Sequence, residues 1–187
     1  MRLQAGGIAP DFTIKTLRGK EVTLSEHASK RVWLAFFRFA ACPLCNLRVH
    51  EIIENWSRFA GKVELFAFFQ SPAARLEEFV AKQNPPFPLI ADPEMRLYAT
   101  YGVEKGLGAG LSASVMARTL AAKRKGFKVL TPIEGPAFGI PADFLVDRGG
   151  AIHTAFYGRT LSDHIPFELV DAFLGQTAGA GAAVAGL

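Results

Sequence analysis

Two cysteines three positions apart are the residues of this chain whose type and spacing could do chemistry. They are Cys42 and Cys45, within FFRFAACPLCNLRVHE, and the chain holds no other cysteine. Residues three apart share one face of an α-helix, so a helix beginning at Pro43 would bring both sulfurs together. The start of a helix carries unpaired N–H groups and a partial positive charge, which stabilise a thiolate. Arg38 closes the preceding apolar run and could stabilise the thiolate further.

Four interpretations of the pair compete: a redox-active dithiol, a metal site, a structural disulfide and inert buried cysteines. A closed zinc site needs four ligands. The chain has no second cysteine pair, and although His50 could face the same region, the other three histidines are scattered. A disulfide that closes so short a loop constrains little of the unfolded chain. A redox dithiol is therefore favoured, with Cys42 expected to project from the helix start into solvent, close to Cys45.

Pro141 is the second residue singled out, because it stands at the entrance of an apolar strand pattern. Proline lacks the N–H donor that a sheet ladder uses, so it is expected at the first residues of a strand. A cis Ile140–Pro141 bond would make this position understandable. It would turn the Ile140 backbone toward the sulfurs, where an extended partner segment could pair with it. An ordinary trans proline at a strand edge is the alternative.

Hydrophobic patterns predict the elements that must position these residues. Nearly continuous apolar runs indicate buried strands, and apolar residues at steps of three and four indicate helices. Strand and helix alternate through the first hundred residues, which favours an α/β sheet. The predicted strands are 13–17 and 21–24 (a hairpin), 32–39, 63–69, 87–91, and 140–146 with 151–157 (a second hairpin). The predicted helices are 43–60, one after Ser71-Pro72 through Val80, one from Asp92-Pro93 to Tyr101, 111–125 and 163–174.

Residues 105–139 form the least regular part of the pattern and are expected to be a helical insertion. Its role is open: it could cap the active site, pack as core or form a dimer contact. Apolar residues of the two last helices are expected to face inward. They are Leu111, Val115, Met116, Leu120 and Ala121 in the first, and Phe167, Leu169, Val170 and Phe173 in the second.

Length and composition bound the class of protein. A chain of 187 residues is most simply one domain, expected over 1–174, with a small-residue tail over 175–187. A net charge of +4 is too small an excess to indicate nucleic acid, and no apolar run is long enough to span a bilayer. The N-terminus shows no apolar signal segment and two cysteines are too few for a secreted disulfide scaffold, so a cytoplasmic location is expected.

The order APDF, hairpin, buried strand, CPLC at a helix start and, later, GIPADFLVDRGGAIHTAFYG resembles the thioredoxin superfamily. Within it, the chain is similar to the alkyl hydroperoxide reductase/thiol-specific antioxidant group, in a peroxiredoxin-like branch with a Cys-x-x-Cys pair. The resemblance implies a thioredoxin-like fold, with a central mixed sheet and helices on both faces. It implies Cys42 as the attacking thiolate, Cys45 as the resolving thiol and Pro141 as the cis proline.

Three positions depart from the usual peroxiredoxin pattern. Ala35 and Phe39 stand where peroxiredoxins carry Pro and Thr or Ser, and Pro141 stands where they carry the catalytic Arg. These differences argue against a fast dedicated peroxidase, with Arg38 as a candidate substitute for the missing guanidinium.

We therefore expect a thiol–disulfide oxidoreductase or antioxidant protein that reduces disulfides or, more slowly, peroxides. An external thiol such as thioredoxin or glutathione would restore the dithiol, and no metal, flavin or nucleotide is expected. Neither nucleic acid nor a membrane is an expected partner, and a homodimer is one open arrangement. A peroxiredoxin-type peroxidase with an atypical site is one alternative, and a non-catalytic binding module on the same fold is another.

Overall fold

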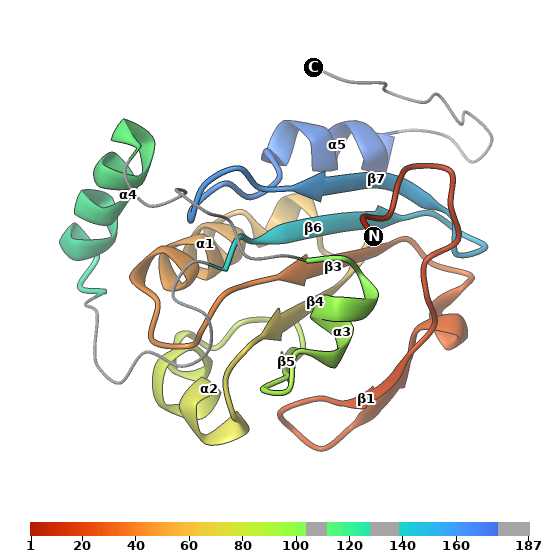
Figure 1. Cartoon of the computed structure of the whole chain (residues 1–187), viewed down its shortest axis with the longest axis horizontal. Helices are drawn as coiled ribbons and strands as arrows, with labels where there is room; N and C mark the ends of the chain where they lie inside the picture. The colour runs from red at the N-terminus through yellow and green to blue at the C-terminus, as the bar shows by residue number, and fades with distance from the viewer. Residues whose placement is uncertain (104–111, 128–138, 176–187) are drawn as a thin grey trace.

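The structure is a computed structural model that describes residues 1–103, 112–127 and 139–175. Its central sheet consists of β3 (Val32–Phe36), β4 (Glu64–Phe69), β5 (Leu89–Ala91), β6 (Ala142–Val146) and β7 (Ile152–Tyr157). The strand order is β5-β4-β3-β6-β7 (Figure 1). β3, β4 and β5 run parallel, whereas β6 lies antiparallel to β3 and β7 antiparallel to β6. The predicted mixed sheet is confirmed.

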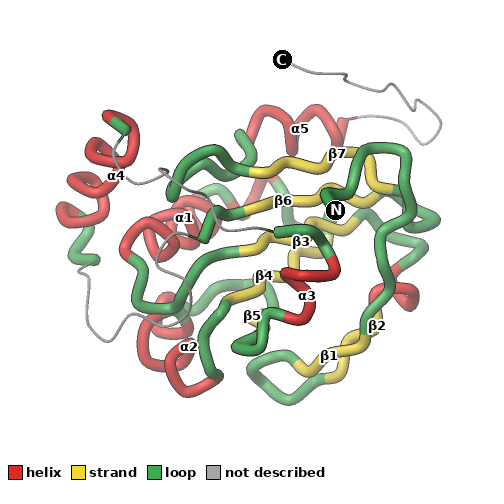
Figure 2. Tube along the Cα trace, viewed as in Figure 1, coloured by secondary structure: helices red, strands yellow, loops and turns green. Residues whose placement is uncertain are grey.

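The two predicted hairpins are present. β1 (Thr13–Lys15) and β2 (Glu21–Thr23) pair in a small antiparallel sheet of their own, apart from the central one (Figure 2). The Leu17 N–H donates to the Leu89 carbonyl oxygen at 2.7 Å, which joins this hairpin to β5. In the second hairpin, Gly149 and Gly150 both have positive φ, as the turn between β6 and β7 requires.

The helices are α1 (Pro43–Glu54), α2 (Ala73–Phe79), α3 (Arg96–Thr100), α4 (Ala113–Arg124) and α5 (Phe167–Gly175). The described residues also include short 3-10 turns, which lie between β2 and β3, between α1 and β4, and between α2 and β5. The 3-10 turns are η1 (Leu24–His27), η2 (Trp56–Arg58) and η3 (Ala81–Gln83).

Successive side chains of β3 point to opposite faces of the sheet, so the core consists of two layers, one on each face. Trp33 and Phe37 pack with residues of α1 and α5. Leu34 and Phe36 point to the opposite face and pack with Tyr98 of α3. Both faces of the sheet are covered, as the thioredoxin-like prediction requires.

Helix α1 is shorter than its predicted range of 43–60. It ends at Glu54, because Asn55 leaves the helical conformation at φ −101° and ψ 10° and its side chain donates to the Glu51 carbonyl oxygen at 2.9 Å. The chain continues through η2 and turns at Gly61, whose φ is 72°. The prediction that Gly61 ends this helix is therefore wrong, because α1 stops at Glu54 and the last predicted turns form η2 instead.

The predicted inward face of α4 is partly wrong. Val115 and Ala122, which lie two turns apart on one face, are buried where α4 packs on α1. Met116 is 69% exposed and Leu120 is 50% exposed. They point away because only the side of α4 that carries Val115 and Ala122 is covered, where the helix packs on α1. Leu111 lies outside the described residues.

Helix α5 shows a smaller error of the same kind. Val170 and Phe173 are buried and Phe167 packs on the core, whereas Leu169 is 41% exposed.

The flanks of α4, residues 104–111 and 128–138, lie outside the described residues, and so does the tail from residue 176 onward. Within the described ranges, no helix combines the length and apolarity needed to cross a bilayer.

Candidate active site

The cysteine pair lies where the chain leaves β3 and begins α1. Cys42 occupies the position just before the helix, in an extended conformation, and Pro43 is the first helical residue. Cys45 follows in the first turn, and both cysteines are free thiols. The predicted helix start at Pro43 is confirmed.

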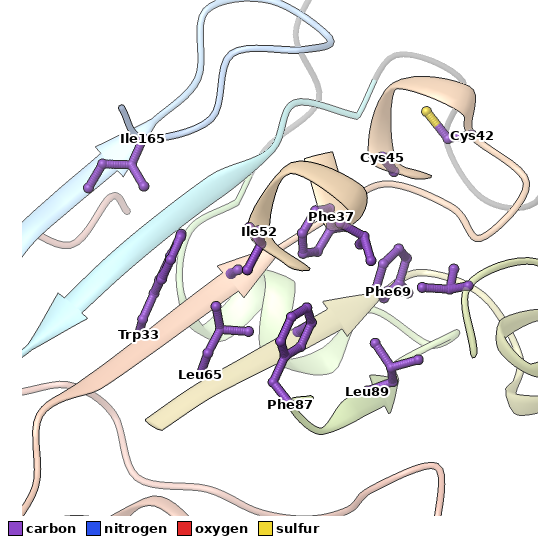
Figure 3. Packing of buried hydrophobic residues seen from close by; sticks show 14 of the residues in the cluster. Trp33, Phe37, Cys42, Cys45, Ile52, Leu65, Phe69, Phe87, Leu89 and Ile165 are labelled. Atoms are coloured by element: carbon purple, nitrogen blue, oxygen red, sulfur yellow. The ribbon is translucent and has the colours of Figure 1, made fainter. Parts of the chain in front are cut away.

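Both sulfur-bearing residues are buried, which overturns the expectation that Cys42 projects into solvent. Cys42 and Cys45 are each 1% exposed and belong to the core layer that also holds Phe37 and Phe69 (Figure 3). The neighbouring apolar residues Phe39 and Leu44 are buried as well, in a core layer to which distant segments such as β4 and α4 contribute. In this conformation the Cys42 side chain is closed to solvent.

The surroundings of Cys42 nevertheless favour its ionised form. Burial opposes the charge, but it is outweighed by a hydrogen bond from the Cys45 thiol, by the Arg38 guanidinium and by the backbone N–H groups of Cys45 and Leu44. Together they lower the pKa of Cys42 to about 6. The Arg38 Nη1 donates to the Cys42 Sγ at 3.4 Å. This is the geometry expected of a thiolate at a helix start.

The pKa of Cys45 is shifted in the opposite direction, upward. Burial raises its pKa well above the ordinary value, and the hydrogen bond to Cys42 and the negative charge there raise it further. The nearby Arg38 opposes this shift without reversing it. The pair therefore consists of one thiolate and one neutral thiol, and the neutral thiol donates its proton toward the thiolate.

Two side chains from other parts of the chain, Tyr98 of α3 and Ser71 between β4 and α2, bond the backbone near the cysteines, a role that the sequence patterns did not indicate. The Tyr98 hydroxyl donates to the Phe37 carbonyl oxygen at 2.5 Å and to the Phe68 carbonyl oxygen at 2.9 Å. The Ser71 hydroxyl accepts from the Ala40 N–H at 2.8 Å. Ser71 was predicted to cap a helix, but Pro72 occupies that position.

A second polar group is buried on the α1 side of the sheet. Asp143, at 0% exposure, accepts from Trp33 Nε1 at 2.9 Å, from the Ile165 N–H at 3.0 Å and from His164 Nδ1 at 3.0 Å. His164 also packs against the ring of Phe37, with the ring planes tilted by 44° and the centroids 4.7 Å apart. Sequence alone gave no reason to connect these residues, because His164 looked like one of several scattered histidines.

Pro141 is buried just before β6, at the end of the sheet where β3 leads toward α1. The next residue, Ala142, pairs with Phe36, the last residue of β3. The Pro141 carbonyl oxygen accepts from the Gly158 N–H at 2.9 Å, and a side chain at Gly158 would collide with that oxygen. Pro141 thus lies at the end of the sheet where β3 leads to the cysteines. The cis form of the bond and contact with the sulfurs stay predictions.

Comparison with known proteins agrees with this fold. The model of the AhpC/TSA family matches residues 5–155. The chain belongs to the AhpC/TSA family. The resemblance to peroxiredoxin-like proteins of the thioredoxin fold is confirmed. Within the described residues, no group of three side chains could hold a metal ion.

Curated AhpC/TSA relatives match part of the chain. Peroxiredoxin Bcp of Escherichia coli is 27% identical over 103 residues, which cover 54% of this chain and 65% of that protein. Chloroplastic peroxiredoxin Q of Triticum aestivum is 28% identical over 108 residues, which cover 57% of this chain and 49% of that protein. The chain thus spans less than two thirds of the length of these relatives.

Solved structures match more of the chain at lower identity. The peroxidoxin BcpB of Mycobacterium tuberculosis has a TM-score of 0.67 and 18% identity, covering 92% of this chain and 97% of that one. The thiol peroxidase of Chromobacterium violaceum has a TM-score of 0.64 and 12% identity, covering 93% of this chain and 87% of that one. At such identities the likeness shows the thioredoxin-like fold.

Proposed function

We propose that the protein is a thiol-dependent oxidoreductase in which Cys42 attacks and Cys45 resolves. The Cys42 thiolate attacks one sulfur of a disulfide, forming a mixed disulfide and releasing the other sulfur as a thiolate. With a hydroperoxide, it attacks the terminal oxygen, forming a sulfenic acid and releasing an alcohol or water. Cys45 then loses its proton and attacks the Cys42 sulfur. The leaving thiol or water takes that proton, and a Cys42–Cys45 disulfide remains.

The observation that carries the proposal is the opposite tuning of the two thiols. With a pKa of about 6, Cys42 is roughly 90% ionised at pH 7, against about 3% for an ordinary cysteine. This gain of about 30-fold in thiolate is offset by a loss of about tenfold in intrinsic nucleophilicity. Acidity alone therefore accelerates the attack only a few-fold. The larger advantage is the neutral Cys45 thiol, already hydrogen-bonded to the sulfur that it must attack.

Burial of Cys42 adds a conformational step to this scheme. The thiolate must be uncovered before it meets a substrate, so we propose that the segment from Phe39 to Pro43 opens transiently. Pro141, at the same end of the sheet, is proposed to line the path and to offer backbone groups to an extended substrate segment. Arg38 is proposed to stabilise the thiolate and to orient the group that it attacks.

The same thiol chemistry is the basis for the proposed electron donor and the proposed cellular compartment. A thiol such as thioredoxin or glutathione would attack the Cys42–Cys45 disulfide and restore the dithiol, without a prosthetic group. The peroxiredoxin relatives support a peroxide substrate, and the absence of the usual hydroxyl and guanidinium supports disulfide reduction as the faster reaction. A reducing compartment, the cytoplasm, suits a dithiol that works in its reduced form.

Stopped-flow consumption of hydrogen peroxide and turnover of a disulfide substrate test the proposal. Both are expected to vanish in Cys42→Ser, whereas Cys45→Ser is expected to accumulate a mixed disulfide or a sulfenic acid that mass spectrometry detects. Peroxide consumption far above ordinary thiol rates would establish the peroxidase alternative. Failure of the wild-type protein in both assays would instead support a non-catalytic binding module.

A further inference from the structure

We infer that Asn46 and Gln83 are positioning residues for the attacking thiolate, an inference that rests on the proposed function of Cys42. Asn46 directly follows Cys45 in α1 and is buried. Its amide nitrogen donates to the Ala40 carbonyl oxygen at 2.7 Å and to the Cys42 carbonyl oxygen at 3.0 Å. One side chain thus uses both of its N–H groups to fix the backbone on either side of Ala41.

Gln83 of η3 determines which way the Asn46 amide points. The Gln83 Nε2 donates to the Asn46 Oδ1 at 2.9 Å. Because that oxygen is occupied by a donor, the Asn46 nitrogen must face the two carbonyl groups of the loop. A reversed amide would set its oxygen against those carbonyls and its nitrogen against Gln83. The pair therefore connects η3 to the backbone that carries Cys42.

The residue type at position 46 indicates a function for this bond. Asparagine is a poor helix former, because its side chain competes for backbone hydrogen bonds. Here it stands inside the first turn of α1, and its side chain reaches back to the residues that precede the helix. The Ser71 hydroxyl holds the N–H of the same Ala40 whose carbonyl Asn46 holds. The N–H and the carbonyl group of Ala40 are therefore each held by a side chain from elsewhere in the chain, the first by Ser71 and the second by Asn46.

Anchoring the loop matters because the Cys42 pKa depends on short contacts. The thiolate is stabilised by the Cys45 and Leu44 N–H groups and by Arg38, and burial works against it. If the loop shifts by a fraction of an ångström, the hydrogen bonds weaken while the burial remains. Asn46 and Gln83 thus hold the sulfur among its donors, and without them the thiolate would take up a proton at higher pH.

The test is the pH midpoint of Cys42 alkylation by iodoacetamide, with mass spectrometry to confirm the modified residue. Asn46→Leu, which keeps the side-chain size and removes both donors, is expected to raise the midpoint by about one pH unit. Gln83→Leu removes the donor to Asn46 but leaves the Asn46 amide in place, so it is expected to raise the midpoint by a smaller amount. The rate reached above the midpoint reports access to the sulfur, so acidity and opening are measured separately.

Asn55→Leu is the matched control. Asn55 also donates its amide to the carbonyl four residues earlier, that of Glu51, but at the far end of α1. It is expected to lower thermal stability and leave the midpoint unchanged. A midpoint in Asn46→Leu and Gln83→Leu equal to that of Asn55→Leu would overturn the inference. Should Asn46→Leu fail to fold, Gln83→Leu alone decides it. The midpoint needs no substrate, so absence of turnover would refute the proposed function and leave this inference standing.

Discussion

The Arg38 guanidinium and the Cys42 sulfur, four residues apart, meet across the turn that joins β3 to α1, with Nη1 3.4 Å from Sγ. Arg38 is buried, so its charge acts on the thiolate with little screening by salt. We expect Arg38→Met to raise the Cys42 pKa from about 6 by about one unit, lowering the thiolate fraction at pH 7 to about half. Thiolate absorbance near 240 nm across a pH titration measures this shift.

Arg18→Met is the control for this substitution, because Arg18 is exposed in the turn between β1 and β2. It removes the same charge from the chain and is expected to leave the titration unchanged. Equal curves for the two variants would show that the helix start and Cys45 account for the acidity without Arg38.

The pKa of Cys42 is lowered and that of Cys45 is raised, which predicts that the free energy of unfolding passes through a maximum as pH increases. The Cys42 pKa of about 6 lies below the ordinary value near 8.5, so the unfolded chain binds more protons between them and stability rises with pH across that window. The gain reaches roughly 3 kcal/mol by pH 8.5 and disappears as pH falls through 6. Above pH 8.5 the Cys45 thiol ionises only in the unfolded chain, so stability falls again.

Urea unfolding between pH 5 and 10 under reducing conditions measures this dependence. The Cys42→Ser/Cys45→Ser double variant keeps the remaining titrating groups and is expected to lack the rise between pH 6 and 8.5. If both proteins show the same rise, the low Cys42 pKa does not contribute to folding stability.

The sequence predicted what depends on local periodicity. The apolar runs fixed the strands of the central sheet, and Pro43 with the stripe that follows it fixed the start of α1. Burial of Cys42 could not be read in the same way, because it depends on segments that fold over the loop from elsewhere in the chain. Asp143 lies on β6 and His164 in the loop after β7, and their pairing exists only once that loop packs against β6. The outward turn of Met116 likewise reflects where α4 sits rather than its own pattern.

Tyr98→Phe tests whether the strand ends below the cysteines depend on one hydroxyl. The Tyr98 hydroxyl is the donor for the carbonyls of Phe37 and Phe68, and all three residues are buried. Its removal is expected to cost about 1–3 kcal/mol in the free energy of unfolding. Burial raises the pKa of Tyr98 well above its ordinary value, so the loss is expected to be constant over the neutral range. Tyr101→Phe removes a single bond, to the Pro10 carbonyl, and is expected to cost less.

The buried pair of Asp143 and His164 predicts a second dependence of stability on pH, below that of the thiols. Burial lowers the pKa of His164, although Asp143 opposes this shift, so the folded chain keeps the imidazole neutral where the unfolded chain protonates it. Stability is therefore expected to fall as pH decreases below about 6.5. His164→Asn is expected to reduce this loss, whereas His153→Asn, on the neighbouring strand β7, is expected to retain it.

Asp143→Asn isolates the carboxylate of the same pair. Asp143 accepts from Trp33, His164 and the Ile165 N–H, and an amide would set its own N–H group against one of these donors. We expect a loss of about 1–3 kcal/mol, the range for leaving a buried donor without its hydrogen-bond partner. Chemical unfolding at pH 7 measures it. Because the carboxylate raises the pKa of His164, its removal is expected to lower that pKa further, which NMR titration of the imidazole follows. An unshifted imidazole titration would show that the charge of Asp143 does not act on His164.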